Sequence, residues 1–259
     1  MDRSLNLLYF SPTNTTAQIV KKIASGISEI AKEYNLTLPT DRLDEINFGS
    51  NDVVIIGVPV YAGRVPEILT DYFTKVKGNN TKAIFIVVYG NRHYDDALLE
   101  LKDIFEAQGF IPMAAAAFIG EHSYTSQVGT GRPDADDAKK AKKFGLKIKD
   151  KLGNKDPEIR KLVIKGRYPY KEKVTRPAMA PITNVNCIRC GICAKHCPMG
   201  TIDFSNYKDI DATKCIKCCS CIRRCPVCAK FMNHEIFYKI KQSLIDNCST
   251  VRREPELFI

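Results

Sequence analysis

Features that would assign this chain to several common classes are missing from its sequence. No apolar run approaches about 18 residues, which excludes a membrane-spanning helix. Met1–Phe10 carries no apolar segment followed by a small-residue cleavage site, so we expect no secretory signal peptide. We therefore expect a cytoplasmic protein with no membrane partner, in a compartment where thiols stay reduced.

Two nucleotide-binding loops are also missing. The sequence contains no G-x-x-x-x-G-K-[ST], which argues against a nucleoside triphosphate site. No G-x-G-x-x-G follows the first predicted strand, which argues against a dinucleotide. The histidines have no pattern of catalytic or metal-binding partners, and we interpret all of them as incidental: His93, His122, His196 and His234.

Charge is distributed unevenly along the chain. Residues 1–150 carry 18 Lys and Arg against 19 Asp and Glu, whereas residues 151–259 carry 21 against 10. A basic half of this kind steers an acidic protein partner. No recognition-helix or aromatic RNA-binding motif accompanies it, so we expect no nucleic-acid partner. The sequence leaves the oligomeric state open.

One cysteine pattern occurs twice, the second time 28 residues after the first. Each copy reads C-x2-C-x2-C-x3-C-P, the signature of bacterial ferredoxins with two [4Fe–4S] clusters. In such ferredoxins the fourth cysteine of each run ligates the other cluster. The predicted ligands are Cys187, Cys190, Cys193 and Cys225 for cluster 1, and Cys215, Cys218, Cys221 and Cys197 for cluster 2.

Zinc and disulfides are the alternatives for these cysteines. Zinc sites use C-x2-C pairs but seldom two identical four-cysteine runs ending in proline. Disulfide frameworks are typical of small secreted chains. Cys219, Cys228 and Cys248 fall outside the repeat, and we interpret them as ordinary thiols, although Cys219 and Cys228 are close enough in sequence to compete as ligands.

The first residues predict an anion site. Leu5–Phe10 is an apolar run typical of a buried strand, and apolar residues at helical spacing begin at Ala17. Between them lies a hydroxyl-rich loop, Ser11–Thr16. Free N–H groups and the dipole at a helix N-terminus favour a phosphate, and a loop without Lys or Arg suits a terminal monophosphate. The alternative is an ordinary Ser/Thr helix cap without a ligand.

Further strands and helices alternate after this loop. Asp52–Val60, Thr81–Tyr89 and Phe110–Ile119 are predicted strands, with Leu36–Thr40 as a weak edge strand. Helices are predicted from Pro66 to about Val76, from Asp96 to Gln108 and from Pro133 to Leu152. This alternation is typical of an α/β fold with a doubly wound parallel sheet, whose ligands bind beyond the carboxyl ends of the strands.

Ser11, Thr13, Asn14 and Thr16 resemble the flavodoxin phosphate loop T-x-T-G-x-T, with Asn14 in place of glycine. With the segments GVPVYAGRVP and VVYGNRHYDDALLEL and the cysteine repeat, nearly the whole chain resembles the flavodoxin–ferredoxin fusion proteins of anaerobic microbes. The resemblance implies a flavodoxin-like five-stranded sheet of order 2-1-3-4-5, followed by an α+β 2[4Fe–4S] ferredoxin domain.

The resemblance also implies FMN as a cofactor beside the two [4Fe–4S] clusters. Its phosphate would contact Ser11, Thr13, Asn14, Thr15 and Thr16. One side of its ring would face Pro59, Val60, Tyr61, Ala62 and Gly63, and the other Tyr89, Gly90, Asn91, Arg92, Tyr94 and Asp95. Tyr61 and Tyr94 could stack on the ring or only anchor their loops, and Arg92 could only pair with Asp95 or Asp96.

Four segments follow from these patterns. Residues 1–152 form the FMN-binding domain, residues 153–181 a connector, residues 182–230 the ferredoxin domain, and residues 231–259 a C-terminal helix and tail. Within the last segment, Asn233–Asn247 has helical apolar spacing and Asn233 is its predicted cap.

The predicted function is electron transfer among two clusters, FMN and a redox protein partner, with no catalytic residue. The alternative is an FMN-dependent reductase of a small-molecule acceptor that receives electrons through the clusters. A reductase would need a second pocket over the flavin, for which Gly120–Pro133 is the candidate loop. The same loop could equally cover the FMN.

Overall fold

Strands and helices alternate through the first part of the computed structural model, which describes residues 3–154, 162–173 and 177–259. Parts of the predicted connector, residues 155–161 and 174–176, lie outside the described residues. The strands of this part are β1 (Ser4–Tyr9), β2 (Lys32–Asn35), β3 (Ile46–Phe48), β4 (Asp52–Pro59), β5 (Val76–Gly78), β6 (Thr81–Tyr89) and β7 (Phe110–Ile119). Its helices are α1 (Thr15–Ile27), the 3-10 turn η1 (Pro39–Arg42), α2 (Glu67–Phe73), α3 (Ala97–Glu106) and α4 (Ala135–Gly153).

Six strands form the main sheet, in the order β10-β7-β6-β4-β1-β2. All neighbours from β2 to β7 pair in parallel. The central strands β4 and β6 are buried on both faces, which explains their continuous runs of β-branched residues. A separate short pair, β3 with β5, is also parallel.

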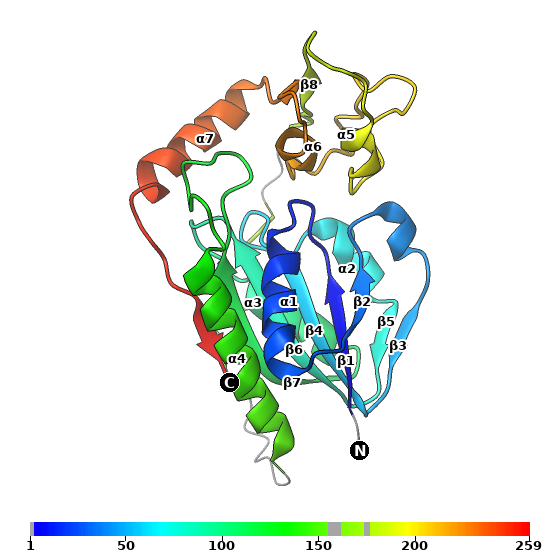
Figure 1. Ribbon diagram of the computed structural model, residues 1–259, viewed down its shortest axis with the longest axis vertical. Helices are drawn as coiled ribbons and strands as arrows, with labels where there is room; N and C mark the ends of the chain where they lie inside the picture. Colours follow the sequence, from blue (N-terminus) through cyan, green and yellow to red (C-terminus); the bar gives the residue numbers. More distant parts are fainter. Residues whose placement is uncertain (1–2, 155–161, 174–176) are drawn as a thin grey trace.

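Helices cover both faces of this sheet (Figure 1). Leu7 and Tyr9 of β1 point into the core shared with α1 and α4, whereas Leu8 and Phe10 point into the core shared with α2 and α3. This alternation is what a strand between two helical layers requires. The predicted doubly wound α/β architecture is therefore confirmed.

The sheet differs from the prediction at both edges. β10 (Glu256–Phe258) joins β7 as an antiparallel strand, so the sheet has six strands instead of five parallel ones. The other edge strand is β2, and the prediction of Leu36–Thr40 was wrong. Asn35 Oδ1 accepts the N–H of Thr37 at 3.1 Å and its hydroxyl at 2.6 Å, and this local turn ends the strand.

The remaining elements belong to the cysteine-rich part and the tail. They are β8 (Ile182–Thr183), α5 (Ile192–Lys195), α6 (Ser220–Arg223), β9 (Lys230–Phe231) and α7 (Glu235–Cys248). We call residues 182–231 the cysteine-rich module; it lies beyond the carboxyl ends of the parallel strands (Figure 1). Helix α7 begins one residue later than its predicted cap would give, because His234 accepts the N–H of Ile236 in place of Asn233.

The described part of the predicted connector packs against the first domain. The backbone N–H groups of Arg167 and Lys171 both donate to the carboxylate of Asp96, and the Tyr170 hydroxyl donates to Asp103 at 2.7 Å. Leu162 is part of the core beside α3. Within the described ranges, no helix combines the length and apolar character needed to cross a membrane.

Candidate functional site

The loop between β1 and α1 leaves helix donors free. Asn14 has a left-handed backbone (φ 69°) and its side chain does not cap α1, so it takes the conformation that the resemblance assigns to glycine. Ser11 Oγ accepts the N–H of Ala17 at 3.0 Å. The N–H groups of Thr15 and Thr16 make no hydrogen bond to the described residues, as expected for the first turn of a helix.

Thr16 carries an unpaired hydroxyl in this loop. The residue is 1% exposed, and its Oγ1 has no hydrogen-bond partner among the described residues. No other fully buried side-chain nitrogen or oxygen of the described chain shares this state. A buried unpaired hydroxyl costs about 1–3 kcal/mol, so a ligand that reached this atom would gain a donor. Thr13 and Thr15 of the loop line the main cavity, whereas Ser11, Asn14 and Thr16 do not.

A tight turn follows β4. Tyr61 and Arg64 exchange backbone hydrogen bonds of 3.0 and 3.1 Å, and the two residues between them, Ala62 and Gly63, have φ of 52° and 87°. Positive φ at both central positions is the pattern of a type I′ turn. The Arg64 guanidinium binds both carboxylate oxygens of Glu100 at 2.7 and 2.8 Å, which fixes the turn to α3.

The loop after β6 is divided between two tasks. Tyr89, Gly90 and Arg92 line the main cavity. Asn91 is 1% exposed and faces the tail instead, where its side-chain amide donates to the carbonyls of Cys248 at 2.9 Å and Val251 at 2.6 Å.

Two further predicted flavin contacts, Tyr94 and Asp95, are also outside the cavity lining. The buried Tyr94 donates its hydroxyl to Glu256 of β10 at 2.9 Å. Asp95 pairs with Arg92 and with Lys171. Tyr94 therefore joins the loop to the tail, and Asp95 joins it to the segment that precedes the cysteine-rich module.

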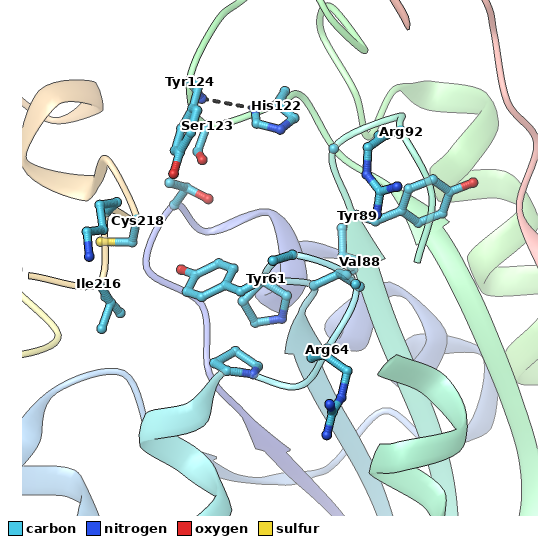
Figure 2. Close-up of a pocket in the computed structure, with 18 of the residues that line it drawn as sticks. Tyr61, Arg64, Val88, Tyr89, Arg92, His122, Ser123, Tyr124, Ile216 and Cys218 are labelled. Carbon is cyan, nitrogen blue, oxygen red and sulfur yellow. Dashed lines mark hydrogen bonds between the residues drawn. The ribbon is translucent and has the colours of Figure 1, made fainter. Parts of the chain in front are cut away.

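The loop after β7 approaches the same cavity. Glu121, His122, Ser123 and Tyr124 line it, which places the start of Gly120–Pro133 over the strand ends. A side-chain carbon added to Gly90 would lie 2.5 Å from the ring of His122, so only glycine allows this close packing. The backbone of Tyr124 donates to His122 Nδ1 at 3.1 Å (Figure 2).

These loops and the cysteine-rich module enclose one cavity of about 600 Å³. That volume lies within the range of small-molecule and cofactor sites. In Figure 2 the Tyr61 hydroxyl points toward the side of the cavity occupied by Ile216 and Cys218. The predicted residues that line it are Thr13, Thr15, Pro59, Val60, Tyr61, Ala62, Gly63, Tyr89, Gly90, Arg92, Cys215 and Cys218.

Tyr61 lies close to the second cysteine run. Burial raises its pKa well above the ordinary value, and the neighbouring Cys218 and Cys219 raise it further. Tyr61 is thus a neutral phenol at physiological pH. It lies where the flavin-loop side of the cavity meets the second cysteine run.

The two cysteine runs fold alike, in keeping with their sequence repeat. Positive φ recurs 28 residues apart at Arg189 and Lys217 (53° and 58°) and at Gly191 and Cys219 (76° and 60°). A short helix starts at the next residue in each run, α5 in the first and α6 in the second. The antiparallel pairing of β8 with β9 and the bridge between Ile202 and Ile210 complete the module.

The predicted ligands of cluster 2 are more deeply buried than those of cluster 1. Three ligands of cluster 2 are buried, Cys197, Cys218 and Cys221, whereas in cluster 1 only Cys193 is buried and Cys190 is exposed. Burial raises the pKa of Cys218 well above its usual value and that of Cys221 to about 12. Burial also raises the pKa of Cys215, and Cys197 adds to that effect, so Cys197 from the first run lies close to the second.

Cys225 has a different environment. Burial alone would raise its pKa, but hydrogen bonds from the backbone N–H groups of Ala229, Lys230 and Val227 lower it below the usual value. The Sγ atom accepts the N–H of Ala229 at 3.1 Å. Donors directed at a sulfur in this way stabilise a thiolate.

Solved flavodoxins are similar in structure to this chain. One from the domain Archaea is 13% identical, covering 58% of this chain and 99% of its own, with a TM-score of 0.40. The flavodoxin of Streptococcus pneumonia TIGR4 is 13% identical over 57% and 98%, with a TM-score of 0.42. Oxidised Flavodoxin 1 from Bacillus cereus is 15% identical over 56% and 96%, with a TM-score of 0.40.

No protein-family model and no curated protein matches the sequence. Structural similarities of the size given above carry no conclusion about function, which rests on the residues themselves.

The chemistry of the donors fits a flavin phosphate at the first loop. Thr16 Oγ1 and the N–H groups of Thr15 and Thr16 are neutral donors at a helix N-terminus, and the dipole there favours an anion. Ser11 instead caps the helix through Ala17, and Asn14 shapes the backbone. Beyond this loop, residues of the loops after β4 and β6 line the cavity, where a flat ring would lie between them.

None of the eleven cysteines is paired in a disulfide. In the ranges that the structure describes, no three His, Cys, Asp or Glu side chains converge as ligands of a single metal ion do. The assignment of the cysteines to clusters therefore rests on the sequence motif. Of the thiols outside the motif, Cys219 and Cys248 are buried and Cys228 is exposed.

Several residues that build the site carried no signal in the sequence. Glu100 fixes the turn after β4, and Thr37 Oγ1 accepts the N–H of Ser11 at 3.0 Å. Arg42 donates to the carbonyl of Pro198 at 2.6 Å, joining the first domain to the cysteine-rich module. Each of these contacts spans more than twenty residues of sequence, so no local pattern reveals it.

Proposed function

We propose that this chain is an electron-transfer protein that holds FMN in the cavity and two [4Fe–4S] clusters on its cysteine repeat. The observation that carries the proposal is the lining of that single cavity. Loops from the carboxyl ends of β1, β4 and β6 form one side, and Cys215 and Cys218 of the second cysteine run lie on the other. A protein that relays electrons has to hold its carriers close together, and FMN in this cavity would lie beside a cluster held by Cys215 and Cys218.

Different residues would bind the phosphate and the ring of FMN. Thr15 and Thr16 would hold the phosphate through neutral donors. Tyr61 and Tyr89 would contact the ring from the loops on either side. Bound there, FMN would supply exchange between one-electron and two-electron carriers.

The ligand exchange between the runs is part of the proposal. Cys197 of the first run packs in one buried cluster with Cys221 of the second. This proximity supports Cys197 as the fourth ligand of cluster 2. Cys193 belongs to the same buried cluster, so the two predicted ligand sets adjoin there.

Exposure suggests an order for the carriers. The predicted ligands of cluster 1 include the exposed Cys190, and the nearby Val185 and Ile188 are 93% and 62% exposed. Those of cluster 2 are mostly buried, and two of them, Cys215 and Cys218, line the cavity. We propose that an acidic redox protein of the cytoplasm exchanges electrons with cluster 1, which passes them through cluster 2 to FMN. The basic C-terminal half would attract such a partner.

Cofactor content tests this function. Protein purified without oxygen is expected to contain one FMN and about eight irons. Reduced protein should then be oxidised rapidly by a redox protein. Zinc in place of iron, with no flavin, would overturn the proposal.

Single-cysteine variants test the ligand exchange. Cys197→Ala should remove the electron paramagnetic resonance signal of cluster 2, and Cys225→Ala that of cluster 1. Cys248→Ala is the matched control, because this buried thiol lies outside the repeat. A Cys197→Ala protein that keeps cluster 2 would show that each run ligates its own cluster.

One observation favours the second candidate, reduction of a small molecule at FMN. The cavity continues beyond the flavin loops to Lys173, Lys214 and Lys217, which would suit an anionic acceptor. One observation counts against the reductase. The carboxylate of Glu121 in the covering loop already binds Arg223 and the N–H of Gly131, so it holds the loop instead of facing a substrate. Saturable oxidation of the reduced protein by one anionic metabolite, and by no redox protein, would favour the reductase.

A further inference from the structure

Helix α6 of the second cysteine run contacts the phosphate loop directly. The side chain of Ser220 is completely buried, and its Oγ donates to the carbonyl of Pro12 at 2.7 Å. The guanidinium of Arg224 donates to the same oxygen at 3.3 Å. Pro12 closely precedes the residues that would hold the FMN phosphate, so α6 fixes the backbone from which that site is built.

The same helix holds the loop that covers the cavity. Arg223 forms an ion pair with Glu121 and donates to the carbonyls of His122 and Ser123, the latter at 3.2 Å. These three residues line the cavity. Two of the loops around the proposed flavin site are therefore held by side chains of α6 and of Arg224, the residue that follows it.

These positions lie between predicted cluster ligands. Cys221 is inside α6, and Cys225 follows Arg224 directly. Iron bound to these two sulfurs would fix the helix at both ends of the Ile222–Arg224 segment. A helix of four residues has little stability of its own, so its order depends on such tertiary anchors.

The first cysteine run provides an internal comparison. The position equivalent to Arg223, 28 residues earlier, is Lys195 of α5, between the predicted ligands Cys193 and Cys197. Lys195 is exposed and makes no ion pair or hydrogen bond through its side chain to the described residues. The link to the flavin loops is thus a property of the second run.

We propose that α6 couples cluster assembly to FMN binding, with Ser220, Arg223 and Arg224 as positioning residues that do not touch FMN. The inference rests on the proposed function. Bound iron orders α6, and α6 in turn holds the phosphate loop and the covering loop in their binding geometry. Because such coupling is reciprocal, bound FMN should also raise the affinity of the chain for its iron by the same factor.

The experiment measures FMN affinity in the full chain by quenching of flavin fluorescence, with the clusters loaded and after iron has been removed by a chelator. We expect iron removal to weaken FMN binding to the wild-type chain about 5- to 150-fold, the usual range of coupling between sites. Arg223→Ala should weaken FMN binding to the loaded protein at unchanged iron content. Removing iron from this variant should then weaken FMN binding by a smaller factor than in the wild type, because the link to the covering loop is already broken and only that to Pro12 remains.

Lys195→Ala is the matched control, since it removes one cation from the equivalent position and should leave FMN affinity unchanged. At equilibrium, a higher chelator concentration should be needed to remove half of the iron with FMN than without it in the wild type, and this difference should shrink in Arg223→Ala.

Two results would overturn the coupling and leave the proposed function standing. They are equal FMN affinity with and without clusters, and equal weakening by Lys195→Ala and Arg223→Ala. A wild-type chain that loads iron but binds no FMN would overturn both.

Discussion

Replacing Thr16 with valine should change stability and FMN affinity in opposite directions. In the flavin-free protein the Oγ1 atom is buried without a partner, at a cost of about 1–3 kcal/mol. Valine has nearly the same shape as threonine. The methyl group of Thr16 already packs against Gly57 of β4, since a side-chain carbon added at Gly57 would lie 3.2 Å from it. Thr16→Val should therefore raise the unfolding free energy of the flavin-free protein by up to that amount.

The same change should weaken FMN binding. A hydrogen bond to a charged group contributes about 1.5–3 kcal/mol, so losing the one from Thr16 to the phosphate corresponds to about a 10- to 150-fold increase in Kd. Urea unfolding of the flavin-free protein measures the first effect, and titration with FMN measures the second. An unchanged Kd would refute the assignment of Thr16 to the phosphate.

Thr37 provides the contrasting control. Its hydroxyl accepts the N–H of Ser11 and donates to Asn35, so it is satisfied without any ligand. Thr37→Val should lower the unfolding free energy of the flavin-free protein by roughly 1–3 kcal/mol, because it leaves a buried N–H unpaired. If both valine variants destabilise the flavin-free protein equally, the hydroxyl of Thr16 is not orphaned.

Three further predictions concern the framework of the site. Gly145→Ala should destabilise the chain by roughly 1–3 kcal/mol in urea unfolding, because its new carbon would lie 2.1 Å from the carbonyl oxygen of Ile23 in α1, whereas Gly153→Ala, with open space around it, should be nearly neutral. Asn91→Ala removes two donors to the tail and should cost about 2 kcal/mol; unchanged hydrogen exchange in β10 would contradict this. Burial raises the pKa of Glu256, but Lys165 and Tyr94 together lower it below the usual value, so its stabilisation is present above about pH 4.3 and is lost as the pH falls through the lower folded-state pKa. Proteolysis of the tail should therefore accelerate below about pH 4 in the wild type and should already be fast at neutral pH in Glu256→Gln.

The central elements of the fold could be predicted from local patterns. Asp52–Val60 and Thr81–Tyr89 are continuous β-branched runs, and the structure has β4 and β6 there, with Val60 just outside β4. Such runs identify a strand buried on both faces without any knowledge of its neighbours. The hydroxyl-rich loop before α1 was visible for the same reason, because a strand, a loop and a helix start are all local.

Contacts between distant segments could not be predicted in this way. Glu-Leu-Phe of β10 has no strand-like length, and only the free edge of β7 gives it a partner. Asn91 follows a glycine in a predicted flavin loop, yet it binds carbonyls near residue 250. The amphipathic pattern of α7 predicted a helix but not its position, where Ile240 and Leu244 line the cavity.

The antiparallel edge strand β10 restricts how the cysteine-rich module can move. The cysteine-rich module is anchored twice, by the segment before it that packs on α3 and by α7 and β10 after it (Figure 1). A domain on one tether can swing through a wide range of orientations, whereas one clamped at entry and exit cannot. Electron transfer between the proposed clusters and FMN would then occur over a fixed distance. The overall rate would be limited by how quickly partner proteins bind and dissociate.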